Sequence, residues 1–404
     1  MTENRLTDRP DRPDRTGRDS FSGSRRPDGR LGIRDRVLVL PSVICSHVVA
    51  EEIAARSPGA VAAPHDHGCG QLGADAEQTE RTLVGLAGNP NVAGTVVVGL
   101  GCETVRSDAV AAAVEERGLP VRELTIQDAG GTDACVDRGA AAVADLRESA
   151  APQEPAEADD STATADDSAA TLGDLTVGVV VDDLADSTRR HAHPLVAAFV
   201  ERVAAAGGRV VVAGNERFAA HPEETRALVG GAAADRLLDA AGRPARATRV
   251  GTEAATRGFD AATGFLGDAP VTGVVAYGER VGAGHDRGDV DAANGTNADG
   301  GVTILDAPSR VEEAATGLAA AGAHLILHVT GQGTPAGHPV VPVVKLSGDA
   351  DTLAAVPDDI DLDAREADAD DLESLLLAVA DGDRACAERH GLTEFAIARA
   401  GPST

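Results

Sequence analysis

The chain has 404 residues, 43% of them hydrophobic and only 2% aromatic, which suffices for two or three domains with an aliphatic core. It carries 65 acidic and 36 basic side chains, and its formal net charge at pH 7 is −29. So negative a surface repels phosphate groups, which argues against nucleic acids and anionic membranes as partners. We expect no membrane span, because no run of 18 apolar residues occurs, and no secretion signal.

The basic side chains are almost all arginine, and Lys345 is the one lysine of the chain. Few lysines and a dense acidic surface are typical of proteins from a high-salt cytoplasm, where salt screens the self-repulsion. A moderately acidic enzyme encoded by a GC-rich genome is the alternative interpretation. In a cytoplasmic protein, the five widely spread cysteines are expected to be reduced thiols.

Apolar runs that suit buried strands alternate with stretches of helical periodicity between residues 36 and 148. The expected strands are 36–43, 61–63, 94–103 with its glycine turn, and 120–126. The expected helices are 46–57, 74–88, 108–118 and 134–148. Strands that alternate with helices through short loops predict a parallel, doubly wound sheet.

The same alternation restarts after an acidic, low-complexity segment. The expected strands are 175–181, 209–214, 271–278, 302–308, 323–329 and 340–347. The expected helices are 193–208, most of 215–270, 311–321 and 370–391, and 278–301 is a Gly/Asp/Asn-rich loop. We predict an α/β protein with two doubly wound, mainly parallel-sheet domains. Its parts are a disordered tail over 1–20, a first domain over 21–149, an acidic linker over 150–173 and a second domain over 174–404.

Ligand-type side chains gather where strands of the first domain end, which is the edge at which doubly wound sheets bind ligands. They are Cys45 after the first strand, His65, Asp66, His67 and Cys69 after the second, and Cys102 and Glu103 after the third. Imidazole, thiolate and carboxylate together suit a divalent metal such as Fe²⁺ or Zn²⁺. The alternative is that the cysteines are small core residues and the histidines cap a loop.

Two features of the second domain suggest anion binding. The glycine-rich turn Thr330-Gly331-Gln332-Gly333-Thr334 follows a buried strand and could present backbone N–H groups to an anion. Lys345 lies on the next strand, where a lysine provides a compact charge and an amine that can act as a base. Lys345 could equally be the one lysine that remains by chance. His324 and His328 flank an apolar strand and are interpreted as packed residues.

Several motifs resemble the large catalytic portion of the altronate and galactarate dehydratases. The run PHDHGCGQLGADAEQTERTLVGLAGNPNVAGTVVVGLGCE (64–103) carries the resemblance most specifically. FSGSRRPDGRLGIRDRVLVLPSVICS, VTGQGTP with VVKLS, and ERHGLTEFAI add to it. The resemblance is close over residues 21–135 and looser over 302–398.

This sequence departs from the family pattern at three places. A family Glu-Cys-Gly-Gly-Ser-Asp run corresponds here to Val180–Ala185, so Asp182, Asp183 or Asp186 would have to replace its lost acid. A family Asn-Lys-Ala-Gly-Gly segment has no match in 278–301. The family turn usually carries an arginine where Gln332 stands. These departures predict a changed substrate or a loss of activity.

The resemblance implies a metal-assisted hydro-lyase, most often Fe²⁺-dependent, that converts a sugar acid into a 2-keto-3-deoxy acid. It implies that His65, His67, Cys69 and Cys102 bind the metal, and that Lys345, His67 and Glu103 are catalytic. The turn from Thr330 to Thr334 and Arg34 are expected to bind the substrate. We also expect a homo-oligomer and a separate small β-rich subunit.

Two alternatives to sugar-acid dehydration stay open at this point. One is a lyase that acts on another small 2-hydroxy acid, such as sulfolactate, because the altered second domain favours a changed substrate. The other is a non-catalytic paralogue that binds a small anion.

Overall fold

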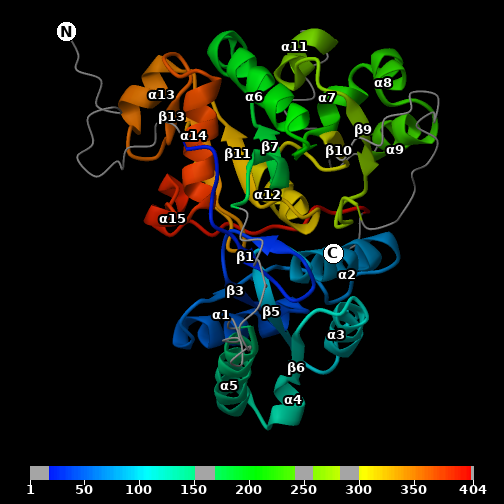
Figure 1. The fold of residues 1–404 in the computed structure, drawn as a ribbon. Coiled ribbons are helices and arrows are strands. Elements are labelled where there is room, and N and C mark those ends of the chain that lie inside the picture. The colour runs from blue at the N-terminus through cyan, green and yellow to red at the C-terminus, as the bar shows by residue number, and fades with distance from the viewer. Residues whose placement is uncertain (1–17, 151–168, 242–257, 283–299, 402–404) are drawn as a thin grey trace, which may run out of the picture.

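The computed structural model describes residues 18–150, 169–241, 258–282 and 300–401. The expected tail, the acidic linker and the Gly/Asp/Asn-rich loop lie mostly outside these residues, and the boundaries of the four predicted parts stay predictions. Strands and helices alternate along the chain and build two parallel sheets, one below the other in Figure 1. This confirms the predicted α/β class with two mainly parallel sheets. No described helix is long and apolar enough to cross a membrane.

The first sheet has four parallel strands in the order β4-β3-β5-β6. Its strands are β3 (Arg36–Pro41), β4 (Ala60–Ala62), β5 (Val92–Gly99) and β6 (Val121–Thr125). The helices around it are α1 (His47–Arg56), α2 (Ala74–Ala87), α3 (Ser107–Glu115), α4 (Ile126–Ala129) and α5 (Thr132–Ala150). Val37 and Val39 pack with the core of α1 and α5, whereas Leu38 and Leu40 join the core of α2 and α3. Helices cover both faces, which explains the continuous apolar strands.

The second sheet has seven parallel strands in the order β13-β12-β11-β7-β8-β10-β9. They are β7 (Thr176–Val181), β8 (Arg209–Val212), β9 (Val271–Val275), β10 (Gly301–Leu305), β11 (Leu325–Val329), β12 (Val343–Ser347) and β13 (Leu362–Asp363). The described helices are α6 (His193–Ala205), α7 (Asn215–Ala219), α8 (Pro222–Val229), α9 (Gly231–Ala241), α11 (Phe259–Thr263), α12 (Val311–Ala320), α13 (Ala350–Ala355), α14 (Ala369–Ala380) and α15 (Cys386–His390). Helices α6 and α14 cover one face, and α12 on the other face packs against α2 of the first domain.

Some expected elements differ in detail. The predicted helix 370–391 is broken into α14 and α15, because Gly382 adopts a positive φ of 111° that ends helical geometry. The strand expected over 340–347 begins at Val343, after Pro342, which lacks an N–H for strand pairing. A small antiparallel hairpin of β1 (Ser24–Arg25) and β2 (Leu31–Gly32) precedes the first sheet and was not predicted.

Each sheet has a reversal point, where the connections leave two neighbouring strands in opposite directions; the second sheet also has β10 inserted between β8 and β9. In the first sheet the reversal lies between β3 and β5, and in the second it lies between β7 and β11. Ligands of doubly wound sheets bind at such points, beyond the carboxyl ends of the two strands. The topology therefore marks two edges: the loops after β3 and β5, and the loops after β7 and β11.

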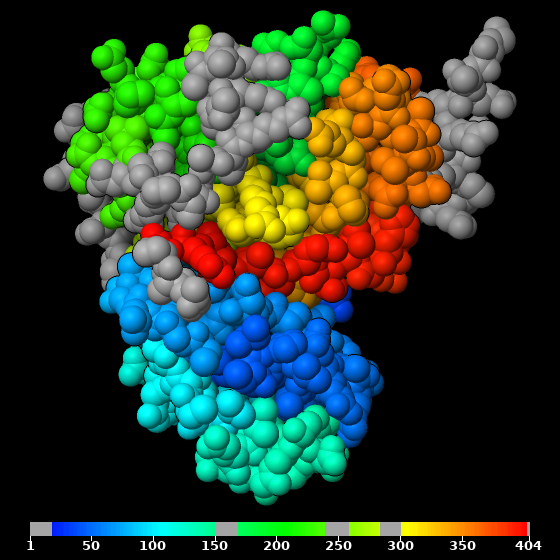
Figure 2. All heavy atoms as spheres, turned by 180° about the vertical axis from the view of Figure 1, so that it is seen from behind, coloured from blue at the N-terminus to red at the C-terminus, as the bar shows by residue number. Residues whose placement is uncertain are grey.

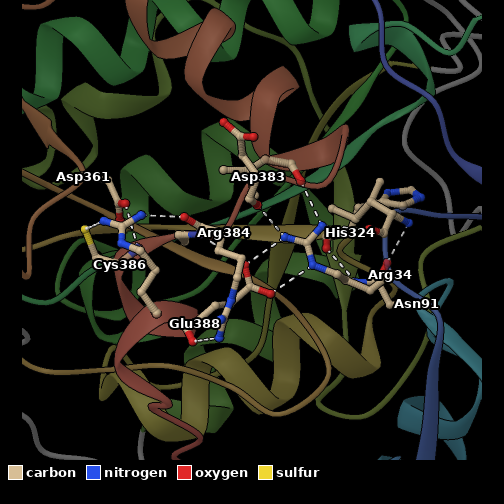
Figure 3. A network of polar contacts seen from close by, with 12 residues as sticks. Arg34, Asn91, His324, Asp361, Asp383, Arg384, Cys386 and Glu388 are labelled. Atoms are coloured by element: carbon tan, nitrogen blue, oxygen red, sulfur yellow. Dashed lines mark hydrogen bonds and ion pairs between the residues drawn. The ribbon is translucent and has the colours of Figure 1, made fainter. Parts of the chain in front are cut away.

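The two domains are joined by buried polar contacts. The Arg34 guanidinium pairs with both carboxylate oxygens of Glu388 in α15, at 2.9 and 2.8 Å, and also donates to the carbonyls of Val379 and Asp383 (Figure 3). The Asn91 amide donates to the carbonyl of His324 at 2.8 Å. The C-terminal segment, red in Figure 2, then runs along the boundary between the domains. The domains therefore form one packed unit.

We predict that Arg34→Ala lowers the free energy of unfolding by about 3 kcal/mol, because it removes both short charge-assisted hydrogen bonds to the Glu388 carboxylate and leaves Arg36, at 3.6 Å, as its ion-pair partner. The two side chains are only 10% and 12% exposed. Urea unfolding measures the change. The matched control is Arg56→Ala, which breaks an exposed ion pair with Glu52 and should cost less than about 1 kcal/mol. Equal effects of the two variants would contradict a structural role for the Arg34 pair.

Candidate functional site

The reversal point of the second sheet carries a pair of acids. Asp182 and Asp183 follow β7 directly, and the turn 330–334 follows β11. Asp182 Oδ2 accepts hydrogen bonds from the hydroxyls of Thr330 and Thr334, at 3.0 and 2.9 Å. Asp183 accepts from the backbone N–H of Gly331 and of Ala185. These contacts hold the ends of β7 and β11 together at the point where a ligand is expected.

A histidine beneath this turn is paired with the first acid. His328 on β11 is fully buried, and its Nε2 lies 3.0 Å from Asp182 Oδ2. If Nε2 carries the proton, the lone pair is on Nδ1, which has no hydrogen-bond partner among the described residues. Sequence reasoning interpreted His328 as a packed residue, and the pairing with an acid 146 residues away shows a second role.

Lys345 lies beside this histidine. The register of β11 and β12 places His328 opposite Lys345, so both side chains point to the same face of the sheet. Lys345 is fully buried, and its Nζ has no hydrogen-bond partner among the described residues. The structure therefore brings a cation, an imidazole and a carboxylate to one edge, which reaches the surface at Asp182, Gly331 and Gln332.

Their surroundings shift the pKa values of Asp182 and Asp183 in opposite directions. Burial raises the pKa of Asp182, but the neighbouring His328 and the threonine hydroxyls outweigh burial, so the pKa of this carboxyl lies below its ordinary value. Burial raises the pKa of Asp183, and there the backbone hydrogen bonds do not compensate for it. When the pKa values of two neighbouring carboxyls are shifted in opposite directions, one usually stays ionised and the other serves as the general acid.

The turn itself already uses its N–H groups inside the protein. The N–H of Gly331 donates to Asp183, and those of Gln332 and Thr334 point to the Thr330 hydroxyl at 3.3 Å. A Cβ at Gly331 would lie 2.6 Å from Asp183 Oδ2, so this close approach requires glycine. The acceptor that the Gly331 N–H holds in this structure is therefore the carboxyl group of Asp183.

The loops at the reversal point of the first sheet also meet. The carboxylate of Glu103 accepts from the Ser42 hydroxyl at 3.1 Å and from the N–H groups of Gly101 and Cys102 at 2.7 and 2.8 Å. Partial burial raises the pKa of Glu103, but these hydrogen bonds outweigh it and leave the pKa below its ordinary value. Three thiols near this edge are exposed: Cys45 and Cys102 on the loops after β3 and β5, and Cys69 on the loop after β4, whose Gly68 carbonyl accepts from the N–H groups of Thr104 and Val105.

The expected metal ligands do not fit a metal centre in this arrangement. The Nε2 of His65 lies 2.7 Å from the carbonyl of Pro41, and its Nδ1 accepts from the N–H of His67. The ring of His67 is likewise held at both nitrogens, by the carbonyl of Ile397 and the amide of Gln71. Within the described ranges, no group of three or more His, Cys, Asp or Glu residues could hold one ion, and this includes the expected set of His65, His67, Cys69 and Cys102.

Arg34 is also fully engaged, because its donors go to Glu388 and to backbone carbonyls at the domain junction. We therefore assign it to the junction and not to the substrate. The remaining expected residues divide between two sheets: Lys345 and the turn 330–334 belong to the second, and His67 and Glu103 belong to the first.

Comparison with known proteins identifies the family. A model described as the second domain of D-galactarate dehydratase/altronate hydrolase matches residues 23–151, and one for the C-terminal domain of D-galactarate/altronate dehydratase matches 262–403. The chain belongs to this family. The resemblance that the sequence motifs suggested is thereby confirmed.

Relatives within the family carry two kinds of name. Altronate dehydratase of Bacillus subtilis (strain 168) is 25% identical, with 95% of this chain and 78% of the relative covered. The beta subunit of (2R)-sulfolactate sulfo-lyase from Chromohalobacter salexigens is 28% identical, with 94% and 97% covered. Altronate dehydratase of Escherichia coli (strain K12) is 25% identical, with 93% and 77% covered. All three are lyases, which confirms the expected enzyme class.

The buried histidine of the first sheet makes the stability of this family member depend on pH. Burial lowers the pKa of His65 to about 4, whereas in the unfolded chain the imidazole titrates near 6.5. As the pH falls from 6.5 towards 4, the unfolded state binds a proton that the folded state does not, and stability is lost. We predict that the free energy of unfolding, measured with urea, falls between pH 7.5 and pH 5 by about 2 kcal/mol less in His65→Gln than in the wild type. An unchanged difference would mean that His65 is protonated in the folded protein.

Proposed function

We propose that the protein is a hydro-lyase that removes water from a small sugar acid of the altronate or galactarate type and yields a 2-keto-3-deoxy acid. The observation that carries this proposal is the buried Asp182–His328 pair beside Lys345, at the reversal point of the second sheet. Such a dehydration needs a base for the proton next to the carboxylate, a positive charge for the enediolate that forms, and a proton for the leaving hydroxyl.

The base in this proposal is Nδ1 of His328. Asp182 accepts a hydrogen bond from the N–H at Nε2 and thereby fixes the tautomer. The lone pair then lies on Nδ1, the atom without a partner among the described residues. The charge on Asp182 also stabilises the imidazolium that forms when His328 takes the proton. Asp182 is therefore a positioning residue, and His328 is the group that meets the substrate.

Lys345 supplies the positive charge. Its ammonium group has no carboxylate partner in the described structure, so a substrate carboxylate can pair with it and share the same charge once the enediolate forms. Lys345 as the base is the alternative, with the turn 330–334 holding the carboxylate. Asp183, whose pKa burial raises, is suited to hold the proton that the leaving hydroxyl needs.

The first-sheet residues His67 and Glu103 stay predictions as catalytic groups, and so does Fe²⁺ as cofactor. Metal analysis of protein purified without oxygen tests the prediction of iron. Stoichiometric iron that is lost in Cys69→Ala and Cys102→Ala would show that the first-sheet loops rearrange to bind it.

An elimination from sulfolactate is the second candidate function. It is favoured by the alignment with the sulfo-lyase beta subunit, which extends over 97% of that relative, compared with 77–78% of the altronate dehydratases. The first chemical steps would be the same, because this substrate also has a proton next to its carboxylate, but the leaving group would be sulfite.

We further propose that a small β-rich subunit binds the first-sheet loops. The name of the sulfo-lyase relative describes one subunit of a larger enzyme. In the described part of the chain, the exposed large apolar side chains are Ile44, Val48 and Leu72, at 38%, 57% and 73%, and all three flank these loops. Leu72→Asp should then weaken the complex at least about tenfold in a pull-down titration with the subunit, since it puts a charge into an apolar contact.

We predict that His328→Gln and Lys345→Arg each lower kcat by about a hundredfold or more while the fold stays intact. The control is His390→Gln, which removes an exposed histidine that also pairs with an acid, Asp359 at 2.9 Å, and should leave kcat unchanged. Turnover is followed with altronate, galactarate and (2R)-sulfolactate in molar KCl, by 2-keto acid formation and by sulfite release.

The outcomes separate the candidates. Formation of 2-keto acid without sulfite supports the dehydratase, and sulfite release supports the sulfo-lyase. Wild-type kcat in Lys345→Arg would remove this lysine from the mechanism. No turnover of any of the three substrates, with the small subunit present, would favour a non-catalytic, anion-binding paralogue.

A further inference from the structure

A second concentration of positive charge lies far from the proposed active site. A pocket of about 250 Å³ at the domain junction is lined by four arginines: Arg25, Arg30, Arg209 and Arg280. Arg25 and Arg30 come from the N-terminal hairpin of the first domain, and Arg209 and Arg280 come from the second domain. The pocket is therefore completed only when the two domains are packed together.

Within the described part of the chain, three of these four charges have no ion-pair partner. Arg30 pairs with Asp28, but Arg25, Arg209 and Arg280 form no ion pair with any described residue. Single arginines without an ion pair to a described residue occur elsewhere, as at Arg117 and Arg138, but here three of them line one pocket. In a chain with 65 acidic and 36 basic side chains, such a cluster is a local concentration of positive charge. Like charges so close together destabilise the fold unless an anion lies among them.

Two of the four arginines, Arg30 and Arg280, are held in place by backbone carbonyls. The Arg280 guanidinium donates to the carbonyl of Gly88 at 2.9 Å, and Arg30 donates to the carbonyl of Asn89 at 2.8 Å. Burial and the charge of Arg30 lower the pKa of Arg280. His324 and Asp174 also line the pocket. Both ring nitrogens of His324 contact backbone groups of Thr176 and Leu31, and Asp174 Oδ2 accepts from the N–H and hydroxyl of Thr171, so the arginines supply the donors for an anion.

We propose that this arginine pocket binds a small oxyanion with several negative charges, which bridges the two domains. Guanidinium groups present paired N–H donors that match phosphate and carboxylate oxygens, and the pocket has room for a molecule the size of pyrophosphate or citrate.

The pocket is separate from the substrate site. Thr176 and Arg209, which line it, are the first residues of β7 and β8, whereas Asp182 follows the last residue of β7. Six residues of strand separate the two edges by about 20 Å. The bound anion is therefore an effector or a stabilising ion and not the molecule that reacts.

Isothermal titration with inorganic pyrophosphate tests the proposal, at the lowest KCl concentration at which the protein stays folded. We expect saturable binding of about one anion per chain with a millimolar or lower Kd, and a rise in Tm as the anion binds only the folded state. Citrate is the second probe: binding of citrate but not of pyrophosphate would identify a polycarboxylate as the ligand class. KCl at matched ionic strength should not reproduce the rise in Tm.

Arg209→Gln is the test variant, because the Arg209 side chain has no hydrogen-bond or ion-pair partner among the described residues. Its thermal unfolding in the absence of anion should resemble that of the wild type, and its affinity should fall at least tenfold. Arg209→Lys keeps the charge but loses the paired donors, so its affinity for the anion should lie between those of Arg209→Gln and the wild type. Arg122→Gln at an exposed ion pair is the matched control. Absence of binding of both anions, or equal affinity in Arg209→Gln and the wild type, would overturn the proposal.

Discussion

The ion pair between Arg34 and Glu388 links the two domains to the candidate site. Arg34 precedes β3 of the first sheet, and Glu388 lies in α15, which packs against β12. The N–H of Cys386 in the same helix donates to Asp361, whose other carboxylate oxygen accepts from the N–H of Lys345. A displacement of the first domain would therefore be transmitted through α15 to the strand that carries Lys345. The position of the lysine depends on a contact with another domain.

The pattern of apolar residues was sufficient to predict both sheets, because parallel strands buried on two faces appear as continuous runs of Val and Leu. Strand β13 adds to the edge of the second sheet beside β12, and β1 and β2 pair with each other in a hairpin. Strands β1, β2 and β13 have two residues each, too few for any periodicity. The same applies to the break between α14 and α15, where one glycine ends a helix that composition alone would continue.

The candidate site was predictable only in part. Lys345 could be selected from composition, and the turn 330–334 from its glycines. The partnership of His328 with Asp182 depends on strand order, since β7 and β11 are neighbours in the sheet but about 150 residues apart in the chain. For His65 and His67, residue type suggested metal binding, but the use of each ring nitrogen is decided by Pro41, Gln71 and Ile397, which sequence spacing does not reveal.

The net charge of the protein bears on both proposed anion sites in the same way. An anionic substrate approaches a protein of net charge −29, so long-range attraction cannot bring it in. At molar salt the Debye length is about 3 Å, which removes the repulsion as well and leaves short-range contacts to decide binding. A cation that is buried and not paired with a carboxylate keeps its strength under these conditions, because little salt can screen it. Lys345 is fully buried and of this kind, and in the arginine pocket Arg209 and Arg280 are half-buried and form no ion pair with a described residue.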